Sequence, residues 1–235
     1  MAITTVLFDL DGTLLPMDQE VFIKAYFGLL AKTLAPHGYD PQQLIQAVWT
    51  GTKAMQVNDG SKTNEQAFWD SFCTIMGQER RQDEALFRSF YENQFNQVRS
   101  ACGFDPRAAQ VVARLKEKGL KVALATNPLF PAIATENRIA WAGLKPEDFL
   151  LYTVYENSSR CKPNPDYYRD VVNALGVSPE ECLMVGNDVA EDMAARKLGM
   201  EVFLLTDCVI NKNNEDISAY PHGGFDELLA FIEKL

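Results

Sequence analysis

The sequence predicts an α/β protein, a doubly wound parallel sheet with an all-helical segment inserted after its first strand. Two observations support this. From about residue 101 onward, short apolar runs alternate with helical stretches, as in parallel sheets whose helices connect successive strands. Residues 17–100 instead hold long amphipathic stretches with apolar side chains at helical spacing, and no convincing strand.

The first strand is expected at residues 3–9, a β-branched and aromatic run that ends in an acid. In the segment that follows, Asp40 is a typical N-cap and Pro41 a typical first helical residue. Helical spacing covers residues 21–34, 64–72 and 84–95. Seven aromatic side chains are interpreted as the core of this segment, with one or two expected to face a ligand cleft: Phe22, Tyr26, Phe27, Trp49, Phe68, Trp69 and Phe72.

In the C-terminal part, the expected strands are 121–126, 149–154, 182–186 and 201–205. The expected helices are 131–142, 165–175, 189–198, 225–235 and one that begins at Asp105-Pro106. Four of them are followed by a glycine that can end a helix, namely Gly119, Gly143, Gly176 and Gly199. A polar loop is expected at 211–216. This organisation predicts a sheet domain of residues 1–16 and 101–235 and a helical domain of residues 17–100.

Composition and charge exclude several classes of protein. The 235 residues include 22 basic and 32 acidic side chains, a net charge of −10, which argues against nucleic acid and anionic membrane surfaces as partners. No apolar run approaches the roughly 20 residues that a membrane-spanning helix needs, and no signal peptide is recognisable. Five scattered cysteines without a CxxC motif, and two distant histidines, argue against a zinc site and favour a cytoplasmic protein.

The sharpest motif is Asp9-Leu10-Asp11-Gly12-Thr13, directly after the first strand. Carboxylates at i and i+2 leave a strand end on the same side. Asp9 can then act as a nucleophile, and Asp11 as a general acid toward a leaving oxygen and then as a base for water. Gly12 allows a sharp turn close to a ligand. A plain Asx turn is the alternative. A calcium loop would need oxygen ligands where residues 14–16 are Leu-Leu-Pro.

With these residues the sequence resembles the haloacid dehalogenase-like hydrolase superfamily, most of whose members are phosphatases. The family's four motifs occur in order along the whole chain. DxDGT matches residues 9–13, a strand-ending Thr matches Thr126 before Asn127, a Lys matches Lys162, and an acidic cluster matches residues 186–192. The resemblance implies a Rossmann-like sheet core with a mobile cap. An insertion between the first two motifs, here residues 17–100, is the family's helical cap type.

The resemblance further implies a magnesium-dependent phosphatase that acts on a small-molecule phosphate monoester through an aspartyl-phosphate on Asp9. A carboxylate that attacks a phosphate dianion meets like-charge repulsion, which Mg²⁺ can cancel. The ion would be held by the Asp9 carboxylate, the backbone carbonyl of Asp11 and the fourth motif. Many family members carry an acid at position 187, but here it is Asn. Asp188 is therefore interpreted as the ligand, although it also suits a helix N-cap.

The remaining motif residues are assigned supporting roles by the same resemblance. Thr126 and the amide of Asn127 would hydrogen-bond a phosphoryl oxygen, and Lys162 would compensate the charge of the phosphate and of the nucleophile. Asn187 is interpreted as a polar helper and Asp192 as a supporting acid or alternate ligand. Taken alone, a strand-end threonine or a surface lysine would be an ordinary structural residue.

Two alternatives to the phosphatase stay open. A phosphomutase would pass the phosphoryl group to a second hydroxyl instead of water, a choice that cap closure decides. A binding or regulatory protein could also keep the fold without the reaction. Nucleotide, sugar and small-metabolite phosphates remain equally open as substrates.

Overall fold

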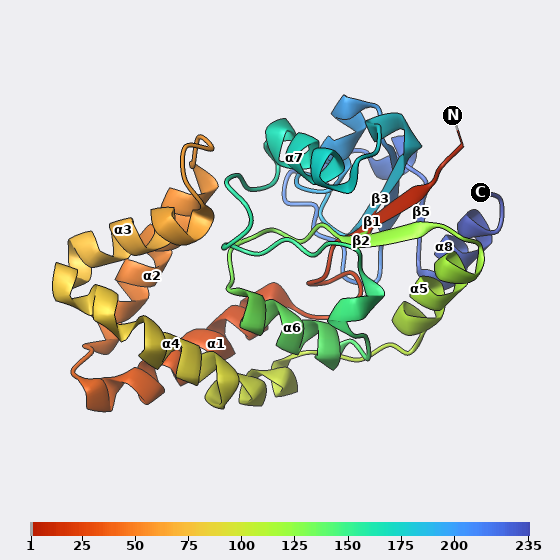
Figure 1. Ribbon diagram of the computed structural model, residues 1–235. Helices are drawn as coiled ribbons and strands as arrows, with labels where there is room; N and C mark the ends of the chain where they lie inside the picture. The colour runs from red at the N-terminus through yellow and green to blue at the C-terminus, as the bar shows by residue number, and fades with distance from the viewer. Residues whose placement is uncertain (1) are drawn as a thin grey trace.

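The computed structural model describes residues 2–235 and contains a five-stranded parallel sheet in the order β2-β1-β3-β4-β5 (Figure 1). The strands are β1 Thr5–Phe8, β2 Lys121–Leu124, β3 Cys182–Gly186, β4 Glu201–Leu205 and β5 His222–Gly223. Every pairing between neighbouring strands is parallel. β1 lies between β2 and β3, so the first strand of the chain ends in the interior of the sheet.

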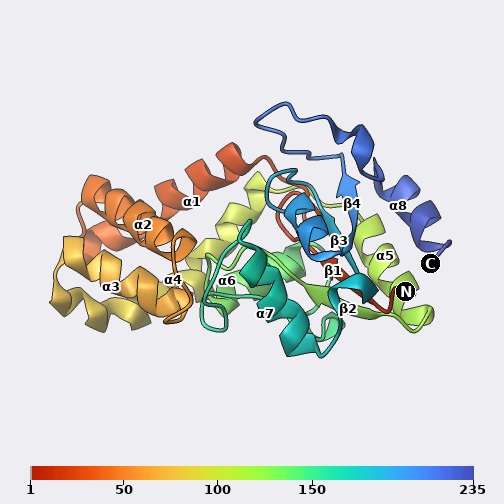
Figure 2. The same cartoon turned by 90° about the horizontal axis from the view of Figure 1, so that it is seen from above.

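Helices cover both faces of this sheet, which confirms the doubly wound α/β class. The α-helices are α1 Gln19–Leu34, α2 Pro41–Gln56, α3 Asn64–Met76, α4 Glu84–Glu92, α5 Arg107–Glu117, α6 Ala132–Trp141, α7 Pro165–Leu175 and α8 Phe225–Ile232. Phe8 packs in the same core cluster as Leu115 of α5, whereas Leu7 packs with Val171 of α7. Alternate residues of a strand point to opposite faces, so α7 lies on one face and α5 and α8 on the other (Figures 1 and 2).

Helices α1–α4 form the segment between β1 and β2, and they lie beyond the carboxyl ends of the strands (Figure 1). The chain enters and leaves this segment side by side. Met17 and Cys102 form an isolated antiparallel bridge, and the Gly103 N–H donates to the Pro16 carbonyl at 2.7 Å. The division into a sheet domain (1–16 and 101–235) and a helical domain (17–100) stays a prediction, which this paired crossing supports.

The strand predicted at residues 149–154 is wrong. The segment runs beside β2 and makes an isolated bridge between Leu124 and Tyr152, but it forms no extended strand. It still hydrogen-bonds β2 through the Leu150 and Thr153 N–H groups and the Leu151 carbonyl, and the Asn157 side chain accepts the N–H of its last residue, Val154, at 2.9 Å. Side-chain acceptors of this kind compete with the hydrogen bonds of a sheet.

The helix predicted at residues 189–198 is also wrong in its extent and type. The structure has a 3-10 helix at Met193–Leu198, preceded by a turn. One carboxylate oxygen of Asp188 accepts both the Ala190 and the Glu191 N–H, at 2.8 and 3.0 Å, so these donors are satisfied without an α-helical turn. The helix predicted at 84–95 ends earlier, at Glu92, and the chain continues as a 3-10 helix at Gln94–Ala101.

Two further features concern the chain as a whole. The five cysteines, Cys73, Cys102, Cys161, Cys182 and Cys208, are all free thiols. None of the helices formed by residues 2–235 is both long enough and apolar enough to cross a membrane. The two-residue strand β5 was not predicted, because His222 and Gly223 carry no strand pattern.

Two glycines at similar positions in 16-residue helices test the packing of the helical segment. A Cβ at Gly51 of α2 would lie 2.5 Å from the Phe68 ring, whereas a Cβ at Gly28 of α1 meets nothing within 4 Å. We expect Gly28→Ala to stabilise the fold by about 1 kcal/mol through helix propensity. We expect Gly51→Ala to destabilise it by about 1–3 kcal/mol through overpacking. Urea unfolding measures both, and equal shifts of the same sign would contradict the packing described.

Candidate active site

The predicted site residues come together because they follow neighbouring strands. Asp9 follows β1, Thr126 lies two residues after β2, and Asn187 follows β3. In parallel sheets the carboxyl ends of adjacent strands meet at one edge, where ligands of α/β proteins bind. A cavity of about 280 Å³ lies there, and all the predicted site residues except Lys162 line it, namely Asp9, Asp11, Thr126, Asn127, Asn187, Asp188 and Asp192.

Lys162 lies beneath this cavity and joins two of its carboxylates. Its ammonium Nζ donates to Asp9 Oδ1 at 2.9 Å and to Asp192 Oδ1 at 2.6 Å, and its side chain is fully buried. Burial alone would lower the pKa of Lys162, but the charges of Asp192 and Asp9 raise that pKa well above its usual range. The residue therefore remains a cation in contact with the predicted nucleophile.

The other oxygen of Asp9 is held by the motif's own threonine. Thr13 Oγ1 lies 3.3 Å from Asp9 Oδ2 and 3.1 Å from Asn187 Oδ1. The Asn187 amide in turn donates to the Cys208 carbonyl at 2.7 Å. Asn187 thus connects three loops at the sheet edge.

Gly12 permits this close approach between the loops after β1 and β3. Its φ is +87°, a left-handed conformation that favours glycine, and a Cβ there would lie 2.3 Å from Asn187 Nδ2. The sharp turn expected at Gly12 from the sequence is therefore confirmed.

Asp11 has a partner that the sequence analysis missed. Arg138 of α6, which is 1% exposed, donates from Nη1 to Asp11 Oδ2, while Asp11 Oδ1 is buried without a hydrogen-bond partner among residues 2–235. Burial raises the pKa of Asp11 above its usual value; Arg138 opposes this and Asp9 reinforces it. The signal was present in the sequence, because Arg138 lies on the apolar stripe of its helix with Ala134 and Trp141.

Glu191 is a second residue that the sequence analysis did not single out, although it belongs to the acidic cluster. Its carboxylate accepts a hydrogen bond from the side-chain Nδ2 of Asn127 at 2.9 Å, and Glu191 lines the same cavity. Burial raises the pKa of Glu191 to about 7. Asn127 Oδ1 is left buried without a partner among the described residues.

The two aspartates of the fourth motif are held differently. Asp188 uses one oxygen, Oδ1, as the cap of the turn that follows it. Asp192 uses both oxygens, one for Lys162 and the other for the Asp188 N–H at 2.9 Å. Burial raises the pKa of Asp192 above its usual value; the charge of Lys162 opposes this rise and that of Asp9 adds to it.

The donor set suits a hard divalent cation. Five carboxylates line the cavity, those of Asp9, Asp11, Asp188, Glu191 and Asp192. Oxygen ligands are those that Mg²⁺ prefers. Among residues 2–235 no group of three or more His, Cys, Asp or Glu side chains is arranged as a ready metal cluster. The expected ligand set needs only two carboxylates and the backbone carbonyl of Asp11, with water and substrate as the other ligands. Asp11 Oδ1, which is buried without a partner among residues 2–235, is a further sign that the site can accept a cation.

Comparison with known proteins decides the family. A family model described as haloacid dehalogenase-like hydrolase matches residues 3–199. The chain belongs to this family of hydrolases. It is similar to the pyrophosphatase PpaX of Halalkalibacterium halodurans, with 25% identity over 206 residues that cover 86% of this chain and 82% of that protein.

Solved structures show the same fold. The 2-haloacid dehalogenase of Pseudomonas syringae pv. Tomato superimposes with a TM-score of 0.67 at 15% identity, over 99% of both chains. The putative hydrolase YfnB of Bacillus subtilis, whose structure is described as bound to magnesium, gives a TM-score of 0.57 at 17% identity, also over 99% of both chains. The predicted sheet core with a helical insertion is confirmed by these likenesses.

The pair of Arg138 and Asp11 can be tested by a double-mutant cycle. Arg138→Met leaves the Asp11 carboxylate without its partner, so we expect the free energy of unfolding to fall by about 3 kcal/mol. Adding Asp11→Asn should recover part of that loss, because no uncompensated charge then remains. Urea unfolding of the two single variants and the double variant measures the coupling, and a double variant less stable than Arg138→Met alone would contradict it.

Proposed function

We propose that the protein is a magnesium-dependent phosphatase that hydrolyses a small-molecule phosphate monoester through an aspartyl-phosphate on Asp9. One observation carries the proposal: a carboxylate at the end of β1, an interior strand of the sheet, is held by a buried lysine, with a second carboxyl group two residues later in the same cavity. The similarity to a pyrophosphatase of comparable length supports phosphoryl chemistry.

In the first half of the reaction, Asp9 attacks the phosphorus atom. A bond forms between the Asp9 carboxylate oxygen and phosphorus, and the bond from phosphorus to the ester oxygen breaks. Asp11 gives its proton to the leaving oxygen. Burial and the Asp9 charge raise the pKa of Asp11 while the Arg138 guanidinium opposes the rise, so Asp11 holds a proton up to a higher pH than an ordinary Asp does.

In the second half, water attacks phosphorus and Asp11 takes a proton from it. The bond between phosphorus and the Asp9 oxygen breaks, which releases inorganic phosphate and restores the Asp9 carboxylate. Arg138 holds the acid in place by bonding one of its oxygens.

Thr126 and Asn127 are proposed to hydrogen-bond the phosphoryl group, and Lys162, which does not line the cavity, is proposed to compensate its charge from behind Asp9. Lys162 places a cation against Asp9 and so reduces the repulsion between the carboxylate and the phosphate. The carbonyl of Thr126 is fixed by the hydroxyls of Tyr167 and Thr153, at 2.9 and 2.6 Å. These two hydrogen bonds hold the chain after β2 in place, so that Thr126 and Asn127 can donate to the phosphoryl oxygens.

Mg²⁺ would be held by the Asp9 carboxylate, the Asp11 carbonyl and the Asp188 carboxylate. When bound, the ion would neutralise the charge of the phosphoryl oxygens. Asp192 has both oxygens engaged by Lys162 and by the chain, so we assign it to positioning Lys162 and the Asp188 loop. Asn187 is assigned to joining the loops, through its contacts to Thr13 and Cys208.

The fold likeness to a dehalogenase does not transfer that reaction, because fold alone does not set chemistry. Asp11 favours an oxygen leaving group, which needs a proton, over a halide, which does not. We propose a cytoplasmic location on the free cysteines and the composition.

Replacing the nucleophile tests the mechanism. We expect Asp9→Asn to lower phosphate release from acetyl phosphate by about 10³-fold or more, since the amide cannot form the acyl phosphate. Asp226→Asn, whose side chain is 76% exposed, is the matched control and should keep its activity. Unchanged turnover in Asp9→Asn would refute the mechanism. With sugar phosphates as substrates, isomerised esters in place of free phosphate would identify a mutase.

Removing the metal tests the ligand assignment. Dialysis against a chelator should abolish phosphate release, and Mg²⁺ should restore it, because the carboxylates then regain their counter-charge. Asp188→Asn should raise the half-saturating Mg²⁺ concentration at least about 10-fold. Full activity after chelation, or an unchanged Mg²⁺ requirement in Asp188→Asn, would contradict the assignment.

A further inference from the structure

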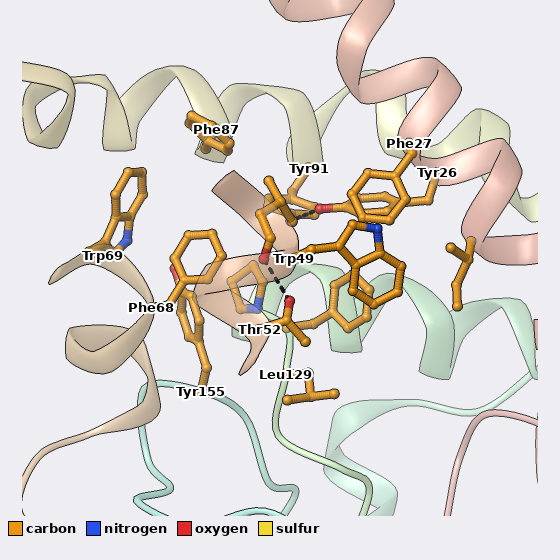
Figure 3. Close-up of a pocket in the computed structure, with 14 residues that line it drawn as sticks. Tyr26, Phe27, Trp49, Thr52, Phe68, Trp69, Phe87, Tyr91, Leu129 and Tyr155 are labelled. Atoms are coloured by element: carbon orange, nitrogen blue, oxygen red, sulfur yellow. Dashed lines mark hydrogen bonds between the residues drawn. The ribbon is translucent and has the colours of Figure 1, made fainter. Parts of the chain in front are cut away.

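A second cavity, of about 120 Å³, lies in the helical segment beside the candidate active site (Figure 3). Helices α1, α2, α3 and α4 and the loop after β2 contribute to it. Its lining is formed by Ile23, Tyr26, Phe27, Val48, Trp49, Thr52, Phe68, Trp69, Phe87, Tyr91, Leu129, Phe130, Pro131 and Tyr155. None of these side chains is charged, and most are aromatic.

The two cavities share a wall. Ile23, Trp49, Thr52, Leu129 and Phe130 line both the apolar cavity and the cavity that holds the carboxylates. A phosphate ester with its phosphoryl group at Asp9 therefore has the apolar cavity within reach of its leaving group.

The hydroxyl groups in the apolar cavity are largely bonded to the protein. Tyr26 and Tyr91 bond each other through their hydroxyls at 2.8 Å, and Thr52 donates to the Val48 carbonyl at 2.9 Å (Figure 3). Trp69 Nε1 is a lining donor that is buried without a partner among residues 2–235, so an occupant could find one indole donor there. An occupant with several hydroxyls or a charge would still lose its hydration and find few other partners in return. The cavity thus disfavours a polyol or a second phosphate as the leaving group.

Its volume fits one ring. Cavities of roughly 150 Å³ lined by apolar side chains bind benzene, so about 120 Å³ matches a single aromatic ring. Rings around the cavity already stand at the edge-to-face and tilted angles that aromatic groups prefer, such as Phe27 and Trp49, whose centroids lie 5.2 Å apart at 41°.

We propose that this cavity holds the leaving group of the substrate, and that this group is an uncharged, single-ring aromatic alcohol. The inference rests on the proposed phosphatase function and names its substrate class. Trp49, which is 47% exposed and lines both cavities, forms the face against which the ring packs. Pyrophosphate is then a poor substrate, unlike what the name of the PpaX relative states for that protein.

The test compares kcat/KM for benzyl phosphate, glycerol 3-phosphate and pyrophosphate. All carry a phosphoryl group, but only the first carries a ring. We expect benzyl phosphate to exceed the other two by at least about 10-fold. Trp49→Ala should reduce its advantage over glycerol 3-phosphate at least about 5-fold. Phe104→Ala, an aromatic side chain that is 58% exposed and lines neither cavity, should leave that ratio unchanged.

The outcomes separate this inference from the proposed function. Suppose that acetyl phosphate is hydrolysed in an Asp9-dependent manner. If benzyl phosphate is then not preferred, or if Trp49→Ala leaves the ratio of benzyl phosphate to glycerol 3-phosphate turnover unchanged, only the aromatic leaving group is overturned. If none of these phosphate compounds is hydrolysed in an Asp9-dependent manner, the proposed phosphatase function itself is overturned. Equilibrium binding of benzylphosphonate and methylphosphonate tests the cavity without turnover, because the two ligands differ by the ring. We expect benzylphosphonate to bind more tightly, and equal affinities would also overturn the inference.

Discussion

The rest of the site depends on the buried lysine that joins Asp9 to Asp192. Removing three charged groups from water is costly, and only close contacts of opposite charge offset that cost. Lys162 meets this condition at 2.9 and 2.6 Å, just before Pro165 begins α7. Gly186 makes the approach possible, because a Cβ there would lie 2.1 Å from Asp192 Oδ2. One ammonium group therefore fixes the relative positions of the end of β1, the start of α7 and the loop after β3.

The asparagine at position 187 makes sense beside this ion group. An acid there would face Thr13 and the Cys208 carbonyl, and a carboxylate cannot donate to a carbonyl as the Asn187 amide does. The aspartates of the fourth motif are instead Asp188, whose Oδ1 caps the turn that follows it, and Asp192, which accepts a hydrogen bond from Lys162. With Asn instead of an acid at position 187, the site has one negative charge fewer, and the Asn187 side chain connects the loops that carry Thr13 and Cys208.

Local sequence signals predict the parts of the structure that local forces decide. The bounds of α7, β3 and β4 follow from caps, glycines and apolar runs and match the prediction. The segments that fail are those where a nearby side chain takes up a backbone N–H, as Asn157 and Asp188 do, because such a side chain offers the backbone an alternative to helix or sheet. Strand-end placement brings the motif residues together, but Arg138 and the aromatic cavity arise only when helices pack. Five of the aromatics interpreted as core line that cavity: Tyr26, Phe27, Trp49, Phe68 and Trp69.

Phe130 connects the two halves of the molecule's proposed chemistry. It lies four residues after Thr126, lines both cavities, and carries the Arg138 guanidinium over its ring at 4.4 Å. Arg138 in turn bonds Asp11, the proposed acid. The side chain that would contact the leaving group therefore packs against Arg138, the partner of the group that would protonate its oxygen. Phe130 thus places the proposed leaving-group cavity directly beside the cation that holds Asp11.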